Sequence, residues 1–291
     1  MDGHKCSLLA EPEGKMWDFA TSIYENLSKR SDKFELNEIL IKRFRDNEIK
    51  VKIKNNVRRN NCFVIHDSSK QPAEWFLEMA LINEALRNSS ANEIVSVVPY
   101  MKFSRQDRKD ESRVAVSAKV LADVMSIYSN RVLTIDAHSP LLPSLYRIPF
   151  DNLYSSRTLH EYLKDRHPEL LDNTVVMSPD AGGASRAKSF ALRLGVKDIV
   201  IGYKYRKKEG EVNEFKIVGD VEGKNILIVD DIVDSGNTLI EATKALRSAN
   251  AKKVYAYCTH GVFSKDARER VCKEVDLMMV TNSIPQPTYD H

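Results

Sequence analysis

Apolar and polar positions along the chain alternate between two periods. Short apolar runs of strand length recur between segments whose apolar residues have helical spacing. The predicted strands are 62–66, 94–99, 132–136, 174–178, 199–201, 226–230, 254–258 and 277–280, and the predicted helices are 73–86, 116–125, 153–163, 184–194 and 239–246. This alternation predicts an α/β fold with mainly parallel sheets flanked by helices, in which ligands bind beyond the carboxyl ends of the strands.

The chain also contains an internal repeat. The segment 84–108 aligns without gaps with 244–268, with identities that include Phe103 with Phe263 and Ser104 with Ser264. Upstream, after a three-residue gap, FVIHD (63–67) matches ILIVD (226–230). Any two α/β units share an apolar helix followed by an apolar strand, so that part of the match is weak evidence. The shared Phe-Ser at the same distance beyond the strand favours duplication. We expect two domains of the same fold, 1–146 and 147–291, with a terminal tail from 283.

Length and composition agree with two ordinary globular domains. The chain has 291 residues, of which 42% are hydrophobic and 29% are charged. The apolar runs are far shorter than the roughly 18 residues needed to span a bilayer, so we expect no membrane partner. The N-terminus has only a short apolar run between Lys5 and Glu11, which lacks the pattern of a secretory signal and favours a cytoplasmic location.

Charge and cysteine content exclude further classes. Lysine and arginine total 44 against 41 acidic residues, a net charge of +3, and the basic residues are interleaved with acids, so no nucleic-acid partner is expected. The four cysteines (Cys6, Cys62, Cys258 and Cys272) are scattered without a CxxC pair, which fits neither a disulfide framework nor a zinc site. Reduced, mostly structural thiols are predicted.

The strongest chemical signal is the segment 226–238, ILIVDDIVDSGNT. A buried strand ends in Asp230 and Asp231 and leads into a helix through Asp234, Ser235, Gly236, Asn237 and Thr238. Small and hydroxyl residues at a helix N-terminus let backbone N–H groups and hydroxyls surround a phosphate. Adjacent carboxylates are suited to accept hydrogen bonds from sugar hydroxyls. A helix cap alone would explain one or two of these residues but not the whole run.

Four other polar segments follow or join predicted strands. SRQDRKD (104–110) brings Arg105, Gln106 and Arg108 together, suited to phosphate oxygens and a base edge, although an exposed charged loop is the plain alternative. IDAHS supplies His138 and SPDAGG supplies Asp180, each a candidate metal or phosphate contact at a strand end. The basic segment 202–215 reads, without context, as a solvated hairpin loop.

The 226–238 segment resembles the phosphoribosyl-pyrophosphate loop of type I phosphoribosyltransferases and of phosphoribosyl pyrophosphate synthetases. The transferases usually have one such domain, whereas the synthetases have two, of which only the second keeps the loop. Here the first-half stretch 66–75 has lost it. Resemblance to the synthetases extends from about residue 44 to the C-terminus through blocks that match in order: RFRDNEI, VVPYMKFSRQDRKDESRVAVSAKVLAD, IDAHS, FDNLY, SPDAGGASRAK, GDVEGKNILIVDDIVDSGNT and YCTHGVFS.

The resemblance implies two type I phosphoribosyltransferase-like domains, an N-terminal one that binds ATP and a C-terminal one that binds ribose 5-phosphate. It implies catalytic roles for Lys204 and Arg206, and Mg²⁺ as cofactor at His138 and Asp180. The ATP-binding residues would be Phe44, Asp46, Asn47, Glu48, Arg105, Gln106 and Arg108, with Asn47 in place of the usual glycine. Ribose 5-phosphate would be bound by Arg206, Asp230, Asp231, Asp234, Ser235, Gly236, Asn237 and Thr238.

The implied reaction is transfer of the diphosphoryl group of Mg-ATP to the 1-hydroxyl of ribose 5-phosphate, giving phosphoribosyl pyrophosphate and AMP. In the synthetases the segment at 44–48 generally receives adenine bound to a neighbouring subunit, which implies a homo-oligomer, at least a dimer. Two alternatives stay open. A type I phosphoribosyltransferase would use the same loop, and a non-catalytic regulatory subunit of a synthetase would share the fold.

Overall fold

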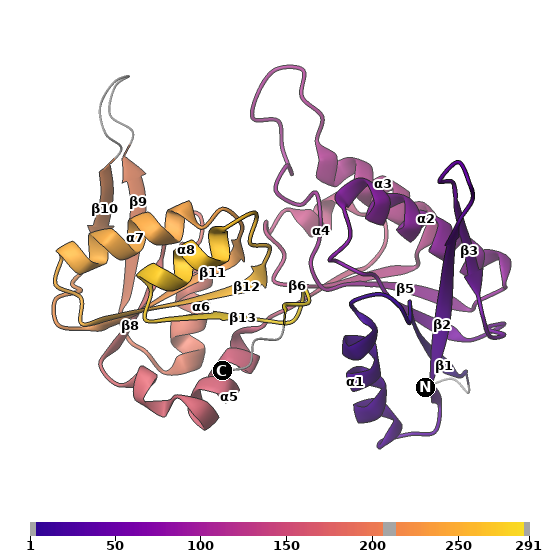
Figure 1. Ribbon diagram of the computed structural model, residues 1–291, viewed down its shortest axis with the longest axis horizontal. Coiled ribbons are helices and arrows are strands. Elements are labelled where there is room, and N and C mark those ends of the chain that lie inside the picture. The colour runs from indigo at the N-terminus through magenta and orange to yellow at the C-terminus, as the bar shows by residue number, and fades with distance from the viewer. Residues whose placement is uncertain (1–3, 206–213, 288–291) are drawn as a thin grey trace. The chain divides into compact units, whose positions relative to one another are not determined.

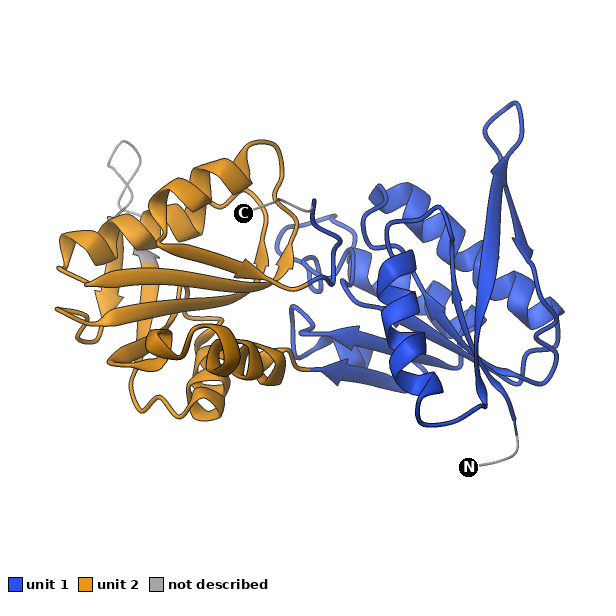
Figure 2. Ribbon diagram, turned by 60° about the horizontal axis from the view of Figure 1, so that its bottom comes forward, with its two compact units in different colours: residues 1–153, 282–291 blue, residues 154–281 orange. Residues whose placement is uncertain are grey.

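The computed structural model describes residues 4–205 and 214–287, which form two compact units (Figure 2). The first unit comprises residues 1–153 with 282–291, and the second comprises residues 154–281. The first unit thus continues beyond residue 146, the boundary predicted from the sequence, because the strand Phe150–Leu153 pairs in parallel with the strand Arg131–Ile135 and completes that sheet.

A seven-stranded, mainly parallel sheet forms the first unit, in the order β3-β2-β1-β4-β5-β6-β7 (Figure 1). Its only antiparallel pair among the described strands is the β2–β3 hairpin. The strands are β1 (Cys6–Ala10), β2 (Phe34–Arg43), β3 (Ile49–Ile53), β4 (Asn61–Ile65), β5 (Glu93–Val98), β6 (Arg131–Ile135) and β7 (Phe150–Leu153). The helices are α1 (Trp17–Ser28), α2 (Pro72–Asn88), α3 (Ser117–Tyr128) and the short α4 (Leu142–Leu145).

Helices cover both faces of this sheet because alternate residues of the buried strands point to opposite sides. On β4, Cys62 and Val64 pack with residues of α2 such as Leu86, while Ile65 packs on the other face with α1. Each helix contributes an apolar stripe to one of these clusters, and α3 joins α2 on its face. The core therefore lies in two layers on either side of the sheet.

The second unit has the same design. Its sheet has the order β10-β9-β8-β11-β12-β13, with β9 and β10 antiparallel and the other pairs parallel. The strands are β8 (Thr174–Ser178), β9 (Ile199–Tyr205), β10 (Glu214–Val218), β11 (Asn225–Val233), β12 (Lys253–Gly261) and β13 (Leu277–Val280). The helices are α5 (Ser156–Arg166), the 3-10 helix η1 (Pro168–Leu171), α6 (Ala184–Leu194), α7 (Asn237–Ser248) and α8 (Ala267–Glu274).

Strand β11 runs through the middle of this sheet and explains why its apolar run is continuous. Ile226 and Ile228 pack on the side of α7 and α8, whereas Leu227 and Val229 pack on the side of α5 and α6. All four are buried. A strand covered on both faces needs apolar residues at every position, and its polar residues appear only where it leaves the core, at Asp230.

The structure confirms the duplication. The order β3-β2-β1-β4-β5-β6 in the first unit matches β10-β9-β8-β11-β12-β13 in the second. Left-handed backbone recurs at aligned positions of the repeat, with φ of 58° at Ser90 and 60° at Asn250, and 62° at Phe103 and 47° at Phe263. Even the hydrogen bonds that end α2 and α7 repeat, because the N–H groups of Ala91 and Ala251 bind the fifth carbonyl oxygen before them.

Each predicted strand and helix is present, with ends shifted by a few residues. The segment 202–215, interpreted as a loop, instead includes the end of β9 and the start of β10.

Within residues 4–205 and 214–287, no helix has the length and apolar character to cross a membrane. Cys62 and Cys258 are buried free thiols, and burial raises the pKa of Cys62 to about 12 and that of Cys258 well above its ordinary value.

Candidate functional site

Two carboxylates mark the carboxyl end of β11 in the second unit. Asp231 is buried, 3% exposed, and Asp230 beside it is half-buried. Burial raises the pKa of Asp230, and the Asp231 carboxylate adds to that effect by repulsion. A pair of neighbouring carboxylates at this depth requires a cation close by to stay charged.

Arg186 on α6 provides that cation, and the sequence interpretation missed it. Its Nη1 lies 2.9 Å from an oxygen of Asp230 and 2.9 Å from an oxygen of Asp231. The guanidinium opposes the rise in the pKa of Asp230 and fixes both side chains at the strand end. An Arg shortly after the glycines of SPDAGG, in the first turn of a helix that faces the sheet, is the signal that could have indicated it.

The predicted phosphate loop connects β11 to α7 and has the backbone that a cradle requires. Gly236 precedes the helix with φ of 74°, and a Cβ added there would clash with Cγ2 of Val271, so only glycine fits. Asp234 accepts a hydrogen bond from the Ser264 hydroxyl. Asn237, the first residue of α7, accepts one from Nη2 of Arg270 at 2.7 Å. Ser235 and Asn237 are exposed, with Thr238 half-buried, so the loop opens to solvent at the positive helix end.

Asp180 follows β8, the strand next to β11. It is exposed, and its Oδ1 accepts the N–H of Gly183 at 2.7 Å. Gly183 must be glycine, because a Cβ there would lie 2.5 Å from the Ser178 hydroxyl oxygen. Asp180 is thus held at the same edge of the sheet as Asp230. The part of the chain that the structure describes holds no group of three or more His, Cys, Asp or Glu side chains placed to bind a metal.

The first unit holds the other predicted residues. Arg105 and Arg108 are exposed in the loop after β5. Gln106 is half-buried there, its side-chain oxygen accepting the Ser117 hydroxyl at 3.2 Å and its carbonyl oxygen accepting the Ala118 N–H at 3.2 Å. The loop is therefore fixed to the start of α3, with its cations outward. In the same unit, His138 is exposed after β6.

The turn of the β2–β3 hairpin carries Phe44, Asp46, Asn47 and Glu48. The Phe44 N–H donates to the carbonyl oxygen of Glu48 at 2.9 Å, and Asn47 has a φ of 69°. Asparagine tolerates this left-handed backbone, so the turn forms without the glycine usual in the resembling family. The Phe44 side chain is 53% exposed. An exposed aromatic ring at a hairpin tip is suited to stack on a base.

Lys204 and Arg206 are the remaining predicted residues. The backbone of Lys204 lies on β9, opposite Phe215 of β10 in the antiparallel pair. Its side chain and all of Arg206 lie outside what the structure describes. Their catalytic roles remain predictions.

The sheet register corrects the alignment of the two strand ends. Cys62 pairs with Ile94 and Ile226 pairs with Val254, and Ile94 and Val254 are aligned positions of the repeat. The segment 62–66 therefore corresponds to 226–230, one position away from the predicted match of 63–67 with 226–230. The error arose because apolar runs align at any register, whereas the side chains must also face the matching layer. His66 thus occupies the position of Asp230.

His66 is a neutral, structural group. It is 3% exposed, its Nε2 lies 3.3 Å from the Ser96 hydroxyl oxygen, and burial lowers its pKa to about 3. The unfolded chain binds this proton near pH 6.5, whereas the folded unit does not. The contribution of His66 to stability is therefore fully present above that pH and is lost as the pH falls toward 3. As the pH falls from 8 to 5, the unfolding free energy is expected to decrease by about 2 kcal/mol because of His66.

Urea unfolding at both pH values, followed by fluorescence, tests this, since both tryptophans, Trp17 and Trp75, belong to the first unit. His66→Gln should show a pH dependence that is smaller by that amount. Equal pH dependence in the two proteins would show that His66 does not remain neutral.

Comparisons with known proteins agree with this geometry. A family model described as the N-terminal domain of ribose phosphate pyrophosphokinase matches residues 14–128, and a phosphoribosyl transferase domain model matches residues 152–289. A ribose-phosphate pyrophosphokinase of Campylobacter jejuni is 39% identical over 270 residues, covering 92% of this chain and 84% of the relative. One from Vibrio parahaemolyticus is 40% identical over 252 residues, covering 86% of this chain and 79% of the relative.

A solved structure gives the same answer. The phosphoribosylpyrophosphate synthetase of Mycobacterium smegmatis superposes with a TM-score of 0.84 at 27% identity, covering 97% of this chain and 90% of that one. Similarity thus extends over both units and not over the phosphate loop alone. On these grounds, the chain belongs to the ribose-phosphate pyrophosphokinase family.

Proposed function

We propose that this protein transfers the β,γ-diphosphoryl group of ATP to the 1-hydroxyl of ribose 5-phosphate, producing phosphoribosyl pyrophosphate and AMP. The observation that carries the proposal is the difference between the loop regions of the two duplicated units. The second unit has a complete sugar-phosphate loop at 230–238, whereas the first unit has His66 in place of Asp230 and a filled loop region. A lone phosphoribosyltransferase gives no reason for a second unit with this change.

In the second unit, the N–H groups and hydroxyls of Asp234 to Thr238 would bind the 5-phosphate. Asp230 and Asp231 would accept hydrogen bonds from ribose hydroxyls, with Arg186 holding both carboxylates in position. Lys204 and Arg206 would stabilise the charge that develops on the β-phosphate and on the bridging oxygen as the bond to AMP breaks.

In the first unit, Arg105 and Arg108 would bind phosphate oxygens of ATP, with Gln106 beside them at a base edge. Phe44, Asp46, Asn47 and Glu48 would form the adenine site. The exposed ring of Phe44 supports this assignment. Since this turn would serve ATP bound to another copy, the proposal includes a homo-oligomer of at least two chains, in the cytoplasm.

Magnesium is part of the proposal, and Asp180 in the second unit and His138 in the first unit would each provide a contact to a Mg²⁺ ion. Mg²⁺ prefers oxygen ligands, keeps several waters and takes few protein groups. The exposed carboxylate of Asp180, fixed through the Gly183 N–H, fits that chemistry. When bound, the ion would neutralise negative charge on the ATP phosphates.

The test is incubation of the purified protein with Mg-ATP and ribose 5-phosphate, followed by chromatography of the nucleotides. We expect AMP to form only when both substrates are present, in equal amount to the phosphorylated sugar product. A phosphoribosyltransferase would produce no AMP from this mixture. A non-catalytic regulatory subunit would leave ATP unchanged.

A further inference from the structure

The loop region that lost its sugar-phosphate motif in the first unit holds an internal anion. Helices α2 and α7 end at aligned positions of the repeat, Asn88 and Ser248, so Glu78 on α2 occupies the position of Thr238 on α7. Thr238 belongs to the loop proposed to bind the phosphate. In the first unit a buried carboxylate, 4% exposed, stands in its place.

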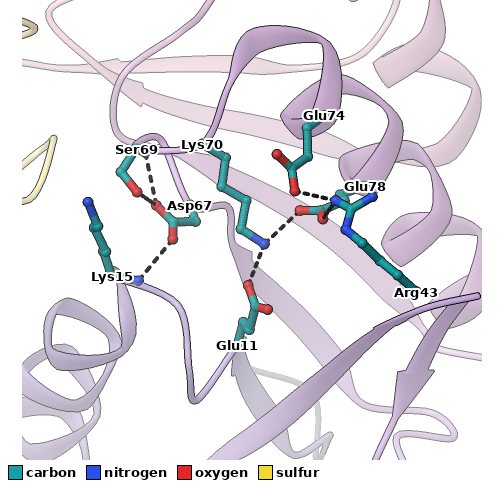
Figure 3. Close-up of polar contacts among 8 residues, drawn as sticks. All are labelled: Glu11, Lys15, Arg43, Asp67, Ser69, Lys70, Glu74 and Glu78. Carbon is teal, nitrogen blue, oxygen red and sulfur yellow. Dashed lines mark hydrogen bonds and ion pairs between the residues drawn. The ribbon is translucent and has the colours of Figure 1, made fainter. Parts of the chain in front are cut away.

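Two cations hold this carboxylate (Figure 3). Lys70, from the loop before α2, donates to Glu78 at 2.7 Å and to Glu11 at 2.5 Å. Arg43, the last residue of β2, lies 3.6 Å from the other oxygen of Glu78 and also pairs with Glu74. Burial raises the pKa of Glu78, and the hydrogen bond from Lys70 opposes that shift. The arrangement is that of a bound anion between an ammonium and a guanidinium.

Arg43 also has a counterpart in the second unit. The last residue of β1 pairs with Glu38 of β2, and the last residue of β8 pairs with Ile201 of β9. Five residues further along each chain segment stand Arg43 and Arg206. Arg206 is the residue predicted to bind substrate. The two arginines thus stand at corresponding positions of the sequence, and in the first unit Arg43 pairs with Glu74 and Glu78.

Asp67 and Ser69 of this loop are also engaged within the unit. The carboxylate of Asp67 accepts the Lys15 N–H at 2.9 Å on one oxygen and the Ser69 N–H at 2.9 Å on the other (Figure 3). The Ser69 hydroxyl donates to the same carboxylate at 2.6 Å. By the sheet register, Asp67 occupies the position of Asp231, so a carboxylate stands at that point in both units. Glu78 is the carboxylate that replaces a hydroxyl, that of Thr238, and its charge would repel a phosphate.

This internal anion is joined to the proposed adenine turn. Nη1 of Arg43 donates to the carbonyl oxygen of Asn47 at 3.3 Å, while its Nη2 faces the carboxylates of α2. The same guanidinium thus ties the tip of the β2–β3 hairpin to the helix. Without Glu78 and Glu74, nothing among these contacts would hold Arg43 against α2.

We propose that the Glu78 carboxylate serves in the first unit as a built-in substitute for the sugar phosphate, binding Arg43 so that the turn 44–48 is held ready for ATP. The inference rests on the proposed function and makes Glu78 and Arg43 positioning residues. They act through the turn and not on the reacting atoms. The degenerate loop is then a support for the nucleotide site rather than a remnant.

The test compares steady-state kinetics of the full chain with Glu78→Ala and Arg43→Met. Arg43→Met is expected to raise the KM for ATP roughly tenfold or more, because the turn loses its anchor. Glu78→Ala should raise it by less, because Glu74 still pairs with Arg43. The KM for ribose 5-phosphate should stay unchanged. Acetate, a carboxylate small enough for the vacated space, should lower the ATP KM of Glu78→Ala toward the wild-type value but have no effect on Arg43→Met. Sodium chloride at equal ionic strength should not restore it.

Glu38→Ala is the matched control, because Glu38 pairs with Lys54 at 2.7 Å on the same hairpin but away from the turn. Its ATP KM should equal that of wild type. If wild type makes no AMP, the proposed function fails and takes the inference with it. If wild type is active and Arg43→Met keeps a normal ATP KM, or a folded Glu78→Ala does not respond to acetate, only the inference is wrong. If Glu78→Ala does not fold, the ATP KM of Arg43→Met still tests the inference, because Arg43 is partly exposed.

Discussion

Replacing Lys204 with alanine is expected to lower turnover roughly 10²- to 10³-fold, with the KM for ATP nearly unchanged. Transfer of a diphosphoryl group builds charge on the leaving oxygen of AMP and on the β-phosphate, and an ammonium there acts mainly in the transition state. The backbone of Lys204 lies in β9, one residue before the strand ends at Tyr205, and pairs with Phe215 of β10. Steady-state AMP formation at saturating substrate measures the effect.

Lys197→Ala is the control for this experiment. Lys197 is exposed and precedes β9, so its loss removes the same charge at a position without a proposed role. Turnover of this variant should remain close to wild type. Near-normal turnover of Lys204→Ala, or a rise in the KM for ATP alone, would contradict the assignment of Lys204 to catalysis.

Arg186→Met is expected to destabilise the second unit by about 3–5 kcal/mol, because it leaves two adjacent buried carboxylates without their cation. Asp231 and Arg186 have side chains only 4% and 19% exposed, so solvent compensates little of the loss. The pKa of Asp230, already raised by burial and by Asp231, should rise further. Since protonation relieves the repulsion, the destabilisation should be larger at pH 8 than at pH 6.

Urea unfolding followed by circular dichroism, together with hydrogen exchange of the β11 amides, measures this change. Arg193→Met is the control, because Arg193 is exposed in the last turn of the same helix, and its loss should change the unfolding free energy by no more than about 0.5 kcal/mol. An Arg186→Met protein as stable as Arg193→Met would show that the carboxylates do not depend on this guanidinium.

The sequence predicted well the elements whose apolar residues form a continuous run or a helical stripe. The strand Thr174–Ser178, the edge strand Leu277–Val280 and the helix Ala184–Leu194 have the predicted bounds. Gly195, with φ of 72°, ends that helix in a left-handed turn, the conformation in which glycine commonly ends helices.

The strands that escaped prediction lie at or near the edges of the sheets or at the N-terminus. In β3 lysines alternate with apolar residues, and β2 mixes charged with apolar positions, so neither forms an apolar run. β1 was interpreted only as a terminus without a signal sequence, although it pairs on both sides within the sheet. Such strands are specified by their neighbours more than by their own composition.

The site shows the same limit. Motifs contiguous in the chain, such as Asp230 to Thr238, are legible because spacing along the sequence fixes spacing at the loop. Arg186 escaped notice because it meets Asp230 across 44 residues of chain, through the packing of α6 on the sheet. Glu78 was missed for a related reason, since its equivalence to Thr238 is recognised only when α2 and α7 are aligned at their ends.

The most direct test of the central claim uses ATP labelled in the β-phosphate, incubated with magnesium, ribose 5-phosphate and the purified protein. If the diphosphoryl group moves as a unit after attack on the β-phosphorus, the label leaves with the sugar and the AMP is unlabelled. Appearance of labelled ADP, which would report transfer of the γ-phosphoryl group alone, or labelled pyrophosphate without a sugar product, would contradict the account.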